Sequence, residues 1–204
     1  MKIVVLNGSP KGKTSVTMQY VHYIEKKFPQ HEMNILNISE RIRKIETVKE
    51  TFEQIMKEIE AADGVIWAFP LYVFLVPYQY KRFIELIWEN SAEKAFEDKY
   101  TAALSTSIHF YDHLAHSYIQ GVCDDLSMKF AGSFSADMYD LLKESERSRL
   151  HMFADNFFQV IEEKIPIQRS YPQISVKHFD YQLIENIDKI ILNKNKVVVL
   201  TDSQ

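Results

Sequence analysis

The chain begins with Lys2-Ile-Val-Val-Leu-Asn-Gly-Ser-Pro-Lys-Gly-Lys-Thr-Ser-Val-Thr17, and this stretch decides the fold. The apolar run at residues 3–6 indicates a buried strand, and the polar residues after it indicate a tight loop. A helical pattern follows from about Thr14. A strand that passes through a short loop into a helix directs backbone N–H groups and the helix N-terminus toward one point, which favours a phosphate dianion.

The same loop is rich in groups that bind anions. Its hydroxyl donors are Ser9, Thr14, Ser15 and Thr17, and its positive charges are Lys11 and Lys13. These residues predict a phosphate site, but they leave open which phosphate compound binds there.

Composition narrows the class of protein. A chain of 204 residues fits one α/β domain with a short extension, and its net charge of −4 argues against a nucleic-acid-binding surface. The single cysteine, Cys123, excludes an internal disulfide and a paired-cysteine metal or iron–sulfur site. No signal-peptide pattern and no apolar run of about 20 residues is present, so we expect a soluble cytoplasmic protein that does not enter a membrane.

Strand and helix patterns alternate along the chain. Further strands are expected at residues 33–38, 65–69, 100–104 and 130–134, with amphipathic helices between and after them. Five strands alternating with five helices predict an α/β fold, in which a doubly wound parallel sheet lies between two helical layers. The continuous apolar run at 65–69 suits a central strand, and the more polar run at 33–38 suits a sheet edge. The segment that holds Ile42 and Ile45 is expected to be a charged connection.

Domain organisation follows from this pattern. Residues 1–166 are expected to form the ligand-binding domain, and 167–204 a C-terminal extension or the start of a further α/β unit. A helix is expected near 181–192 and a sixth strand at 196–202. In doubly wound sheets ligands bind beyond the carboxyl ends of the strands, which directs attention to loops 7–15, 70–77 and 105–113.

Two of these loops resemble a known family. Asn7-Gly-Ser-Pro, followed by Lys-Gly-Lys-Thr-Ser into a helix, resembles the phosphate loop of the flavodoxin-like NAD(P)H-dependent FMN reductases. Ala68-Phe-Pro-Leu-Tyr, with Val76-Pro and Lys81-Arg-Phe-Ile-Glu downstream, resembles the Pro-x-Tyr flavin loop of that family. The resemblance covers residues 1–165 by topology, and it implies the flavodoxin-like strand order 2-1-3-4-5 with FMN bound to residues 1–166.

The resemblance also implies a set of cofactor-binding residues. The FMN phosphate would be bound by Ser9, Lys11, Lys13, Thr14, Ser15, Val16 and Thr17, and the isoalloxazine ring would be lined by Pro70, Leu71, Tyr72 and Val73. The first loop is about one residue shorter than usual for the family, which leaves the choice between the two lysines open. The third loop lacks the family's glycines; its flavin contacts would come from Ser105, Thr106, Ser107 and His109, with Phe110 or Tyr111 near the ring.

The implied activity is that of an FMN-dependent oxidoreductase. It would take hydride from NAD(P)H as co-substrate and pass electrons to a quinone, a nitro or azo compound, a flavin or a redox protein. No catalytic side chain is assigned, because the cofactor carries the chemistry. Relatives commonly form homodimers that complete the flavin pocket.

Two other functions remain open from the residues alone. One is a flavodoxin-like electron carrier or a non-catalytic flavin-binding module. The other is a nucleotide kinase or NTPase, because Gly12-Lys13-Thr14 matches the end of a Walker A motif. The first glycine of that motif would fall on Asn7, and neither the third nor the fourth strand ends in the aspartate that positions magnesium. The kinase is therefore the less favoured reading.

Three histidines follow the fourth strand. His109, His113 and His116 would share one face of a helix, with Asp112 between them. Imidazoles placed in this way can converge on a metal ion. We favour the alternative that these histidines are solvated or make ordinary hydrogen bonds and bind no metal. His109 is expected to lie near the flavin.

Overall fold

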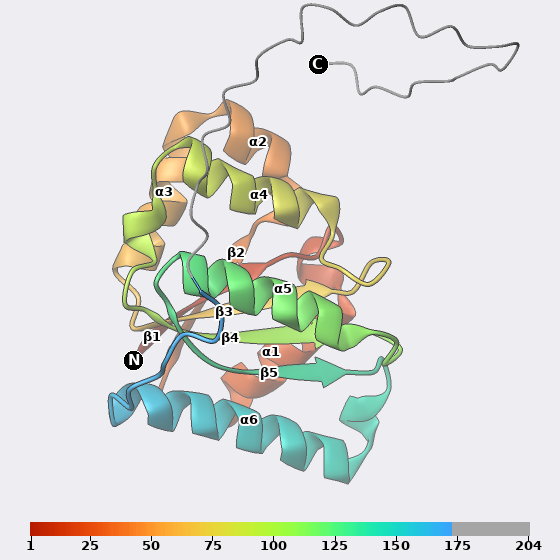
Figure 1. Ribbon diagram of the computed structural model, residues 1–204. Helices are drawn as coiled ribbons and strands as arrows, with labels where there is room; N and C mark the ends of the chain where they lie inside the picture. The colour runs from red at the N-terminus through yellow and green to blue at the C-terminus, as the bar shows by residue number, and fades with distance from the viewer. Residues whose placement is uncertain (173–204) are drawn as a thin grey trace, which may run out of the picture. The chain divides into compact units, whose positions relative to one another are not determined.

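Five parallel strands in the order β2-β1-β3-β4-β5 form the centre of the computed structural model, which describes residues 1–172 (Figure 1). The strands are β1 (Lys2–Asn7), β2 (Glu32–Asn37), β3 (Gly64–Pro70), β4 (Tyr100–Thr106) and β5 (Lys129–Ala136). This order confirms the predicted fold class, and it confirms that the more polar second strand lies at a sheet edge. The helix and strand predicted near the C-terminus lie outside the described residues.

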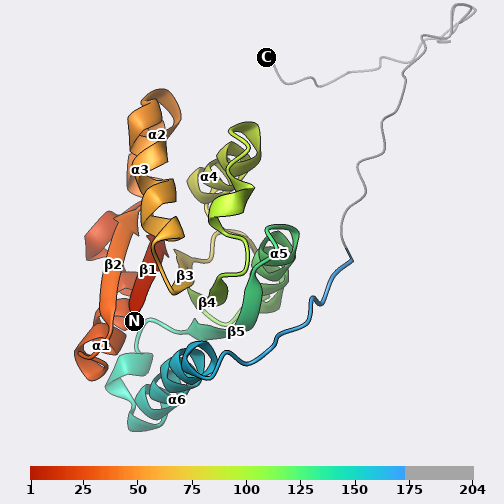
Figure 2. The same cartoon turned by 90° about the vertical axis from the view of Figure 1, so that its left-hand side faces the viewer.

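Helices cover both faces of the sheet (Figure 2). They are α1 (Val16–Lys27), α2 (Ile42–Thr47), α3 (Lys49–Glu60), α4 (Tyr78–Glu89), α5 (Asp112–Asp125) and α6 (Glu144–Glu162). α1 and α6 lie on one face, and α3, α4 and α5 lie on the other, with α2 packed beside α3 and α4. None of the helices in residues 1–172 has the length and apolar content that a membrane span requires.

Side chains from the central strands enter both layers. Ile3 and Val5 of β1 pack toward α1 and α6, whereas Val4 and Leu6 pack toward α3 and α4, and all four are fully buried. Successive residues of a strand point to opposite faces, so a strand covered on both faces must be apolar at every position. This explains why the central strands appear in the sequence as uninterrupted apolar runs.

The carboxyl ends of four strands lie in one row. Asn7 of β1 is paired with Ala68 of β3, Pro70 of β3 with Thr106 of β4, and Thr106 with Ala136 of β5. Because parallel strands in register end at the same edge, the loops that follow β1, β3, β4 and β5 emerge side by side. The register thereby brings segments together that are far apart in the sequence.

Three differences in the helices separate the structure from the sequence prediction, and β4 and β5 each end two residues later than expected. The expected charged connection contains the helix α2, in which Ile42 and Ile45 are buried one turn apart. α1 begins at Val16, because a 3₁₀ turn at Gly12–Thr14 precedes it. α6 ends at Glu162, before the expected end near Pro166. α2 has six residues, fewer than two helical turns, so its apolar residues are too few to show a helical period in the sequence.

A buried histidine, His31, and a partly buried one, His116, predict that acid destabilises the fold. Burial lowers the pKa of His31, whose ring packs against those of Phe28 and Phe158, and burial also lowers the pKa of His116. The unfolded chain therefore binds more protons than the folded chain below about pH 6.5, and stability falls as the pH falls. We expect a loss of at most about 1.4 kcal/mol per histidine for each pH unit.

Urea unfolding at pH 7, 6 and 5 measures this effect. The midpoint should fall toward pH 5, and His31→Phe should reduce the fall because the ring at that position no longer titrates. Equal midpoints at the three pH values would contradict the lowered pKa values of these two histidines.

Candidate active site

The loop between β1 and α1 is held by its own polar groups. The Gly8 N–H donates to the Ala68 carbonyl at 2.7 Å, which fixes the loop to β3. The Ser9 N–H donates to Asn7 Oδ1 at 3.0 Å, and the Lys11 N–H donates to Ser9 Oγ at 3.3 Å. Gly12 follows with φ of +57°, a left-handed conformation that suits glycine. The loop is therefore shaped before any ligand binds.

α1 presents free N–H groups at its first turn. Ser15 is the N-cap residue, and its Oγ accepts a hydrogen bond from the Met18 N–H at 3.3 Å. The N–H groups of Val16 and Thr17 have no acceptor among residues 1–172. Unpaired N–H groups and the positive end of the helix dipole together favour an anion at this position.

A cavity of about 500 Å³ adjoins this helix end. Its volume is in the range of ordinary ligand sites. The three expected loops all reach it, and one residue comes from the segment after β5. Its walls consist of Ser9, Lys11, Ser15, Val16, Thr17, Pro70, Leu71, Tyr72, Val73, Phe74, Thr106, Ser107, Ile108, Phe110 and Met138. The first loop supplies most of the polar residues, and the second and third loops supply most of the apolar ones.

Most residues expected at the site lie on the cavity wall, and four do not. Lys11 lines the cavity, whereas Lys13 and Thr14 lie on the exposed 3₁₀ turn. Ser105 is buried behind the wall, where its Oγ lies 2.8 Å from His116 Nε2. His109 also lies off the wall and contacts carboxylates instead.

Several wall residues were not assigned from the sequence. Phe74 and Ile108 belong to loops that were expected at the site, and their apolar side chains were the available signal. Met138 follows β5, and nothing in its sequence context marks it. Its place on the wall depends on the alignment of strand ends.

A hydrogen bond between two hydroxyls joins α1 to the end of β4. Thr17 Oγ1 of α1 and Thr106 Oγ1 at the end of β4 are 2.7 Å apart. Both residues are buried against the cavity. The helix whose first turn bounds the cavity is thereby connected to the neighbouring strand end.

The loop after β3 contains a strained turn. The Tyr72 N–H donates to the Leu75 carbonyl at 2.8 Å, and the Leu75 N–H donates to the Tyr72 carbonyl at 3.2 Å. The two residues between them, Val73 and Phe74, have φ values of 46° and 70°. Such turns normally contain Asn-Gly, since side chains with a Cβ pay about 1–2 kcal/mol in this conformation.

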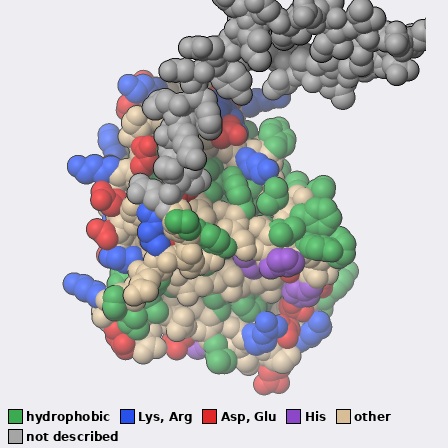
Figure 3. All heavy atoms as spheres, in the orientation of Figure 1, with side chains coloured by type: hydrophobic (Ala, Val, Ile, Leu, Met, Phe, Trp, Pro, Cys, Tyr) green, Lys and Arg blue, Asp and Glu red, His purple; other side chains and the backbone are tan. Residues whose placement is uncertain are grey.

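Aromatic packing supports this turn from the next loop. The ring of Phe74 lies 5.5 Å from the ring of Phe110 and 5.2 Å from that of Tyr111. The space-filling view shows hydrophobic side chains gathered beside the histidines (Figure 3). The turn and the aromatic rings together form an apolar wall of the cavity.

Relief of this strain should stabilise the protein. Val73 is 87% exposed, so Val73→Asn removes little packing and places a residue that tolerates positive φ at the turn. We expect the free energy of unfolding in urea to rise by about 0.5–1.5 kcal/mol. Val73→Ala is the matched control, because alanine retains the penalty of a Cβ. Equal effects of the two substitutions would show that the turn is not strained.

The three histidines have different neighbours. His109 contacts carboxylates, His116 contacts Ser105, and the ring of His113 lies 5.7 Å from that of Tyr111. Within residues 1–172, no group of three or more His, Cys, Asp or Glu side chains is arranged to hold a metal ion.

A family model described as "Flavodoxin-like fold" matches residues 1–110, which is more than half of the chain. The chain belongs to this flavodoxin-like family. The matched range includes the first two loops of the site and most of the third. It does not include Met138 of the cavity wall, or Asp112 and Asp140, the two carboxylates that His109 contacts.

Solved structures share the flavodoxin-like fold. An NADH:FMN oxidoreductase (EMOB) in its apo form is 19% identical with a TM-score of 0.64, over 76% of this chain and 87% of that chain. FerB, a flavoenzyme NAD(P)H:(acceptor) oxidoreductase from Paracoccus denitrificans, is 18% identical with a TM-score of 0.61, over 79% and 97%. RosB with bound 8-demethyl-8-formylriboflavin-5'-phosphate is 10% identical with a TM-score of 0.64, over 98% and 100%. The comparison with curated proteins finds no match.

Proposed function

We propose that the cavity binds FMN and that the chain is an NAD(P)H-dependent oxidoreductase, which passes electrons to a quinone, a nitro or azo compound, a flavin or a redox protein. The observation that carries the proposal is an apolar cavity bounded at one end by the first turn of α1, where two N–H groups lack an acceptor. Structures of the same fold include an NADH:FMN oxidoreductase and an NAD(P)H:(acceptor) oxidoreductase, which supports the proposal.

The polar end of the cavity fits a phosphate. Besides the N–H groups of Val16 and Thr17, the hydroxyls of Ser9 and Ser15 adjoin it. Each of these hydroxyls accepts a hydrogen bond from a backbone N–H, so its own proton remains available to a phosphate oxygen. Lys11 lines the cavity and adds a positive charge, whereas Lys13 does not line it, which supports Lys11 as the phosphate partner in this proposal.

The apolar part of the cavity fits a flat ring. Pro70, Leu71 and Tyr72 form one wall, with the aromatic rings that follow. The N–H groups of Val73 and Phe74 have no acceptor among the described residues, so they can meet the polar edge of a ring system. We include a homodimer in the proposal, since exposed apolar side chains such as Val73 and Phe110 surround the cavity.

This chain needs no nucleophile for such a reaction. When bound, FMN supplies hydride acceptance and electron transfer. The residues of the chain bind the phosphate, orient the ring against the Pro70 wall and exclude water from one side of it. Fixed N–H dipoles at the ring edge stabilise negative charge as it develops there, without reorganisation.

The visible spectrum of the purified protein, with and without added FMN, tests the proposal. We expect saturable FMN binding and rapid bleaching of the bound flavin by NADH or NADPH under anaerobic conditions. Binding without bleaching, together with reduction by a redox protein, would identify an electron carrier instead. A protein that takes up no FMN would overturn the proposal.

A further inference from the structure

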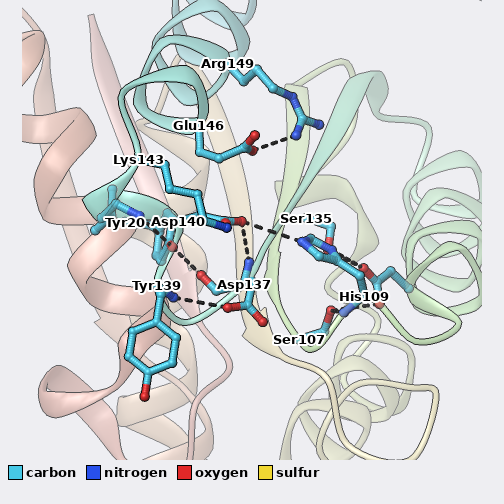
Figure 4. A network of polar contacts seen from close by, with 12 residues as sticks. Tyr20, Ser107, His109, Ser135, Asp137, Tyr139, Asp140, Lys143, Glu146 and Arg149 are labelled. Carbon is cyan, nitrogen blue, oxygen red and sulfur yellow. Dashed lines mark hydrogen bonds and ion pairs between the residues drawn. The ribbon is translucent and has the colours of Figure 1, made fainter.

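His109 lies between two carboxylates that belong to different loops (Figure 4). Its Nδ1 lies 3.1 Å from Asp112 Oδ2 at the start of α5, and its Nε2 lies 3.5 Å from Asp140 Oδ2. Asp140 opens the short 3₁₀ helix Asp140–Leu142 that follows β5. The Nε2 contact with Asp140 is an ion-pair distance and not a hydrogen bond, so it is attractive when the imidazole is protonated and positively charged. Both contacts are therefore favourable together when the ring carries a proton.

Asp112 has partners that keep it charged and in place. The Ser107 hydroxyl donates to Oδ1 at 2.7 Å, and the Ser135 hydroxyl of β5 donates to Oδ2. Burial raises the pKa of Asp112, but the hydrogen bonds from Ser135, Ser107 and His109 outweigh burial and lower it overall. A carboxylate thus faces Nδ1 of His109 throughout the neutral pH range.

Asp140 is anchored in a similar way. Its carboxylate is nearly buried, and it accepts hydrogen bonds from Lys143 Nζ at 2.9 Å and from the Asp137 N–H at 2.8 Å. Burial raises the pKa of Asp140, while these hydrogen bonds lower it further than burial raises it. Lys143 offsets part of the charge, yet both oxygens remain acceptors. The charged groups around His109 are accordingly Asp112, Asp140 and, behind Asp140, Lys143.

The two segments that His109 connects both contribute to the cavity wall. Ser107, Ile108 and Phe110 come from its own loop, and Met138 comes from the segment after β5. His109 itself has a positive φ of 57°, and its N–H donates to Ser107 Oγ at 2.8 Å. A backbone in this conformation persists only where surrounding contacts hold it.

We propose that protonated His109 is a positioning residue, which ties the loop after β4 to the segment after β5 through Asp112 and Asp140 and so holds one wall of the cavity. The tie is stronger when His109 is protonated, because its positive charge then faces two carboxylates. The effect of this tie on FMN affinity rests on the proposed function. The tie itself is present in the chain without a ligand.

Amide hydrogen exchange of the ligand-free protein tests the tie. The informative amides are those of Ser107, His109, Asp137 and Asp140, whose N–H groups are all hydrogen-bonded. At about pH 6, His109→Gln should lower protection in both segments by about three- to tenfold, because the ring is half exposed and the pairs are partly screened. His109→Arg, which is permanently charged, should restore protection.

The pH dependence separates this role from simple packing. After correction for intrinsic exchange rates, the difference between the wild type and His109→Gln should shrink as the pH is raised, while His109→Arg keeps its protection. His22→Gln is the matched control, since His22 is an exposed histidine paired with Glu25 on α1, and it should change neither segment.

Three outcomes would overturn the inference: equal protection in wild type and His109→Gln at about pH 6, loss confined to one segment, or a difference that does not change with pH. A parallel FMN titration should show weaker binding by His109→Gln. If no variant takes up FMN, the proposed function fails, while the exchange result still decides the tie.

Discussion

Ser15→Asp is expected to lower the affinity of the chain for FMN by about 30- to 100-fold. Ser15 is 4% exposed, caps α1 and lines the polar end of the cavity. In the proposed FMN complex a carboxylate there would face the phosphate at close range, where two like charges repel by a few kcal/mol at the dielectric of a protein surface. Aspartate is as good an N-cap as serine, so the helix should remain intact. Quenching of FMN fluorescence measures the affinity.

Two controls separate charge from shape. Ser15→Asn has the size of Ser15→Asp without the charge and also caps helices well, so it should weaken FMN binding much less. Riboflavin lacks the phosphate, and its affinity should be the same in Ser15→Asp and Ser15→Asn. If Ser15→Asp bound FMN as tightly as the wild type, the phosphate would have to lie elsewhere.

Gly8→Ala is expected to cost about 1–3 kcal/mol of stability, as overpacking of a tight site does, and to weaken FMN binding about tenfold. A Cβ at position 8 would lie 2.8 Å from Tyr80 Cδ1. The Tyr80 ring is fully buried, and its hydroxyl donates to the Leu6 carbonyl at 2.7 Å, so the ring cannot withdraw without losing that bond. The loop must shift instead, and it carries Ser9 and Lys11 with it. Urea unfolding and FMN titration measure the two effects.

Gly121→Ala provides the comparison for this substitution. Gly121 lies within α5, and the nearest atom to an added Cβ is 4.0 Å away, on Tyr171. Alanine should stabilise this helix by up to about 1 kcal/mol and leave FMN binding unchanged. If Gly8→Ala unfolded at the same urea concentration as the wild type, the contact between Gly8 and Tyr80 would not constrain the loop.

The sheet and the first two loops of the site could be predicted because their signals are local. The run at residues 65–69 is apolar at every position, which indicates a strand buried on both faces. Asn7-Gly-Ser-Pro and Pro70-Leu-Tyr stand directly after such runs, so their position at the edge of the sheet follows from the topology. The strand order was confirmed by the structure, and the family by the match to residues 1–110.

What could not be predicted depends on contacts between distant residues or on unusual local conformations. Val73-Phe74 is not a turn-forming pair, and its left-handed conformation depends on packing against Phe110 and Tyr111. The interaction of His109 with Asp140 joins residues of different loops. The position of Met138 on the cavity wall follows from the pairing of β4 with β5, which no motif near it marks.

The hydroxyl pair of Thr17 and Thr106 restricts how this site can drift in evolution. If one hydroxyl is lost, the other has no hydrogen-bond partner, and an unpaired buried hydroxyl costs about 1–3 kcal/mol of stability. Valine at both positions keeps the side-chain shape and leaves no hydroxyl unpaired. Lineages that descend from this chain should therefore have two hydroxyls or none at these positions. A change from two hydroxyls to none would have to pass through a single replacement, which has lost much of the chain's small free energy of unfolding.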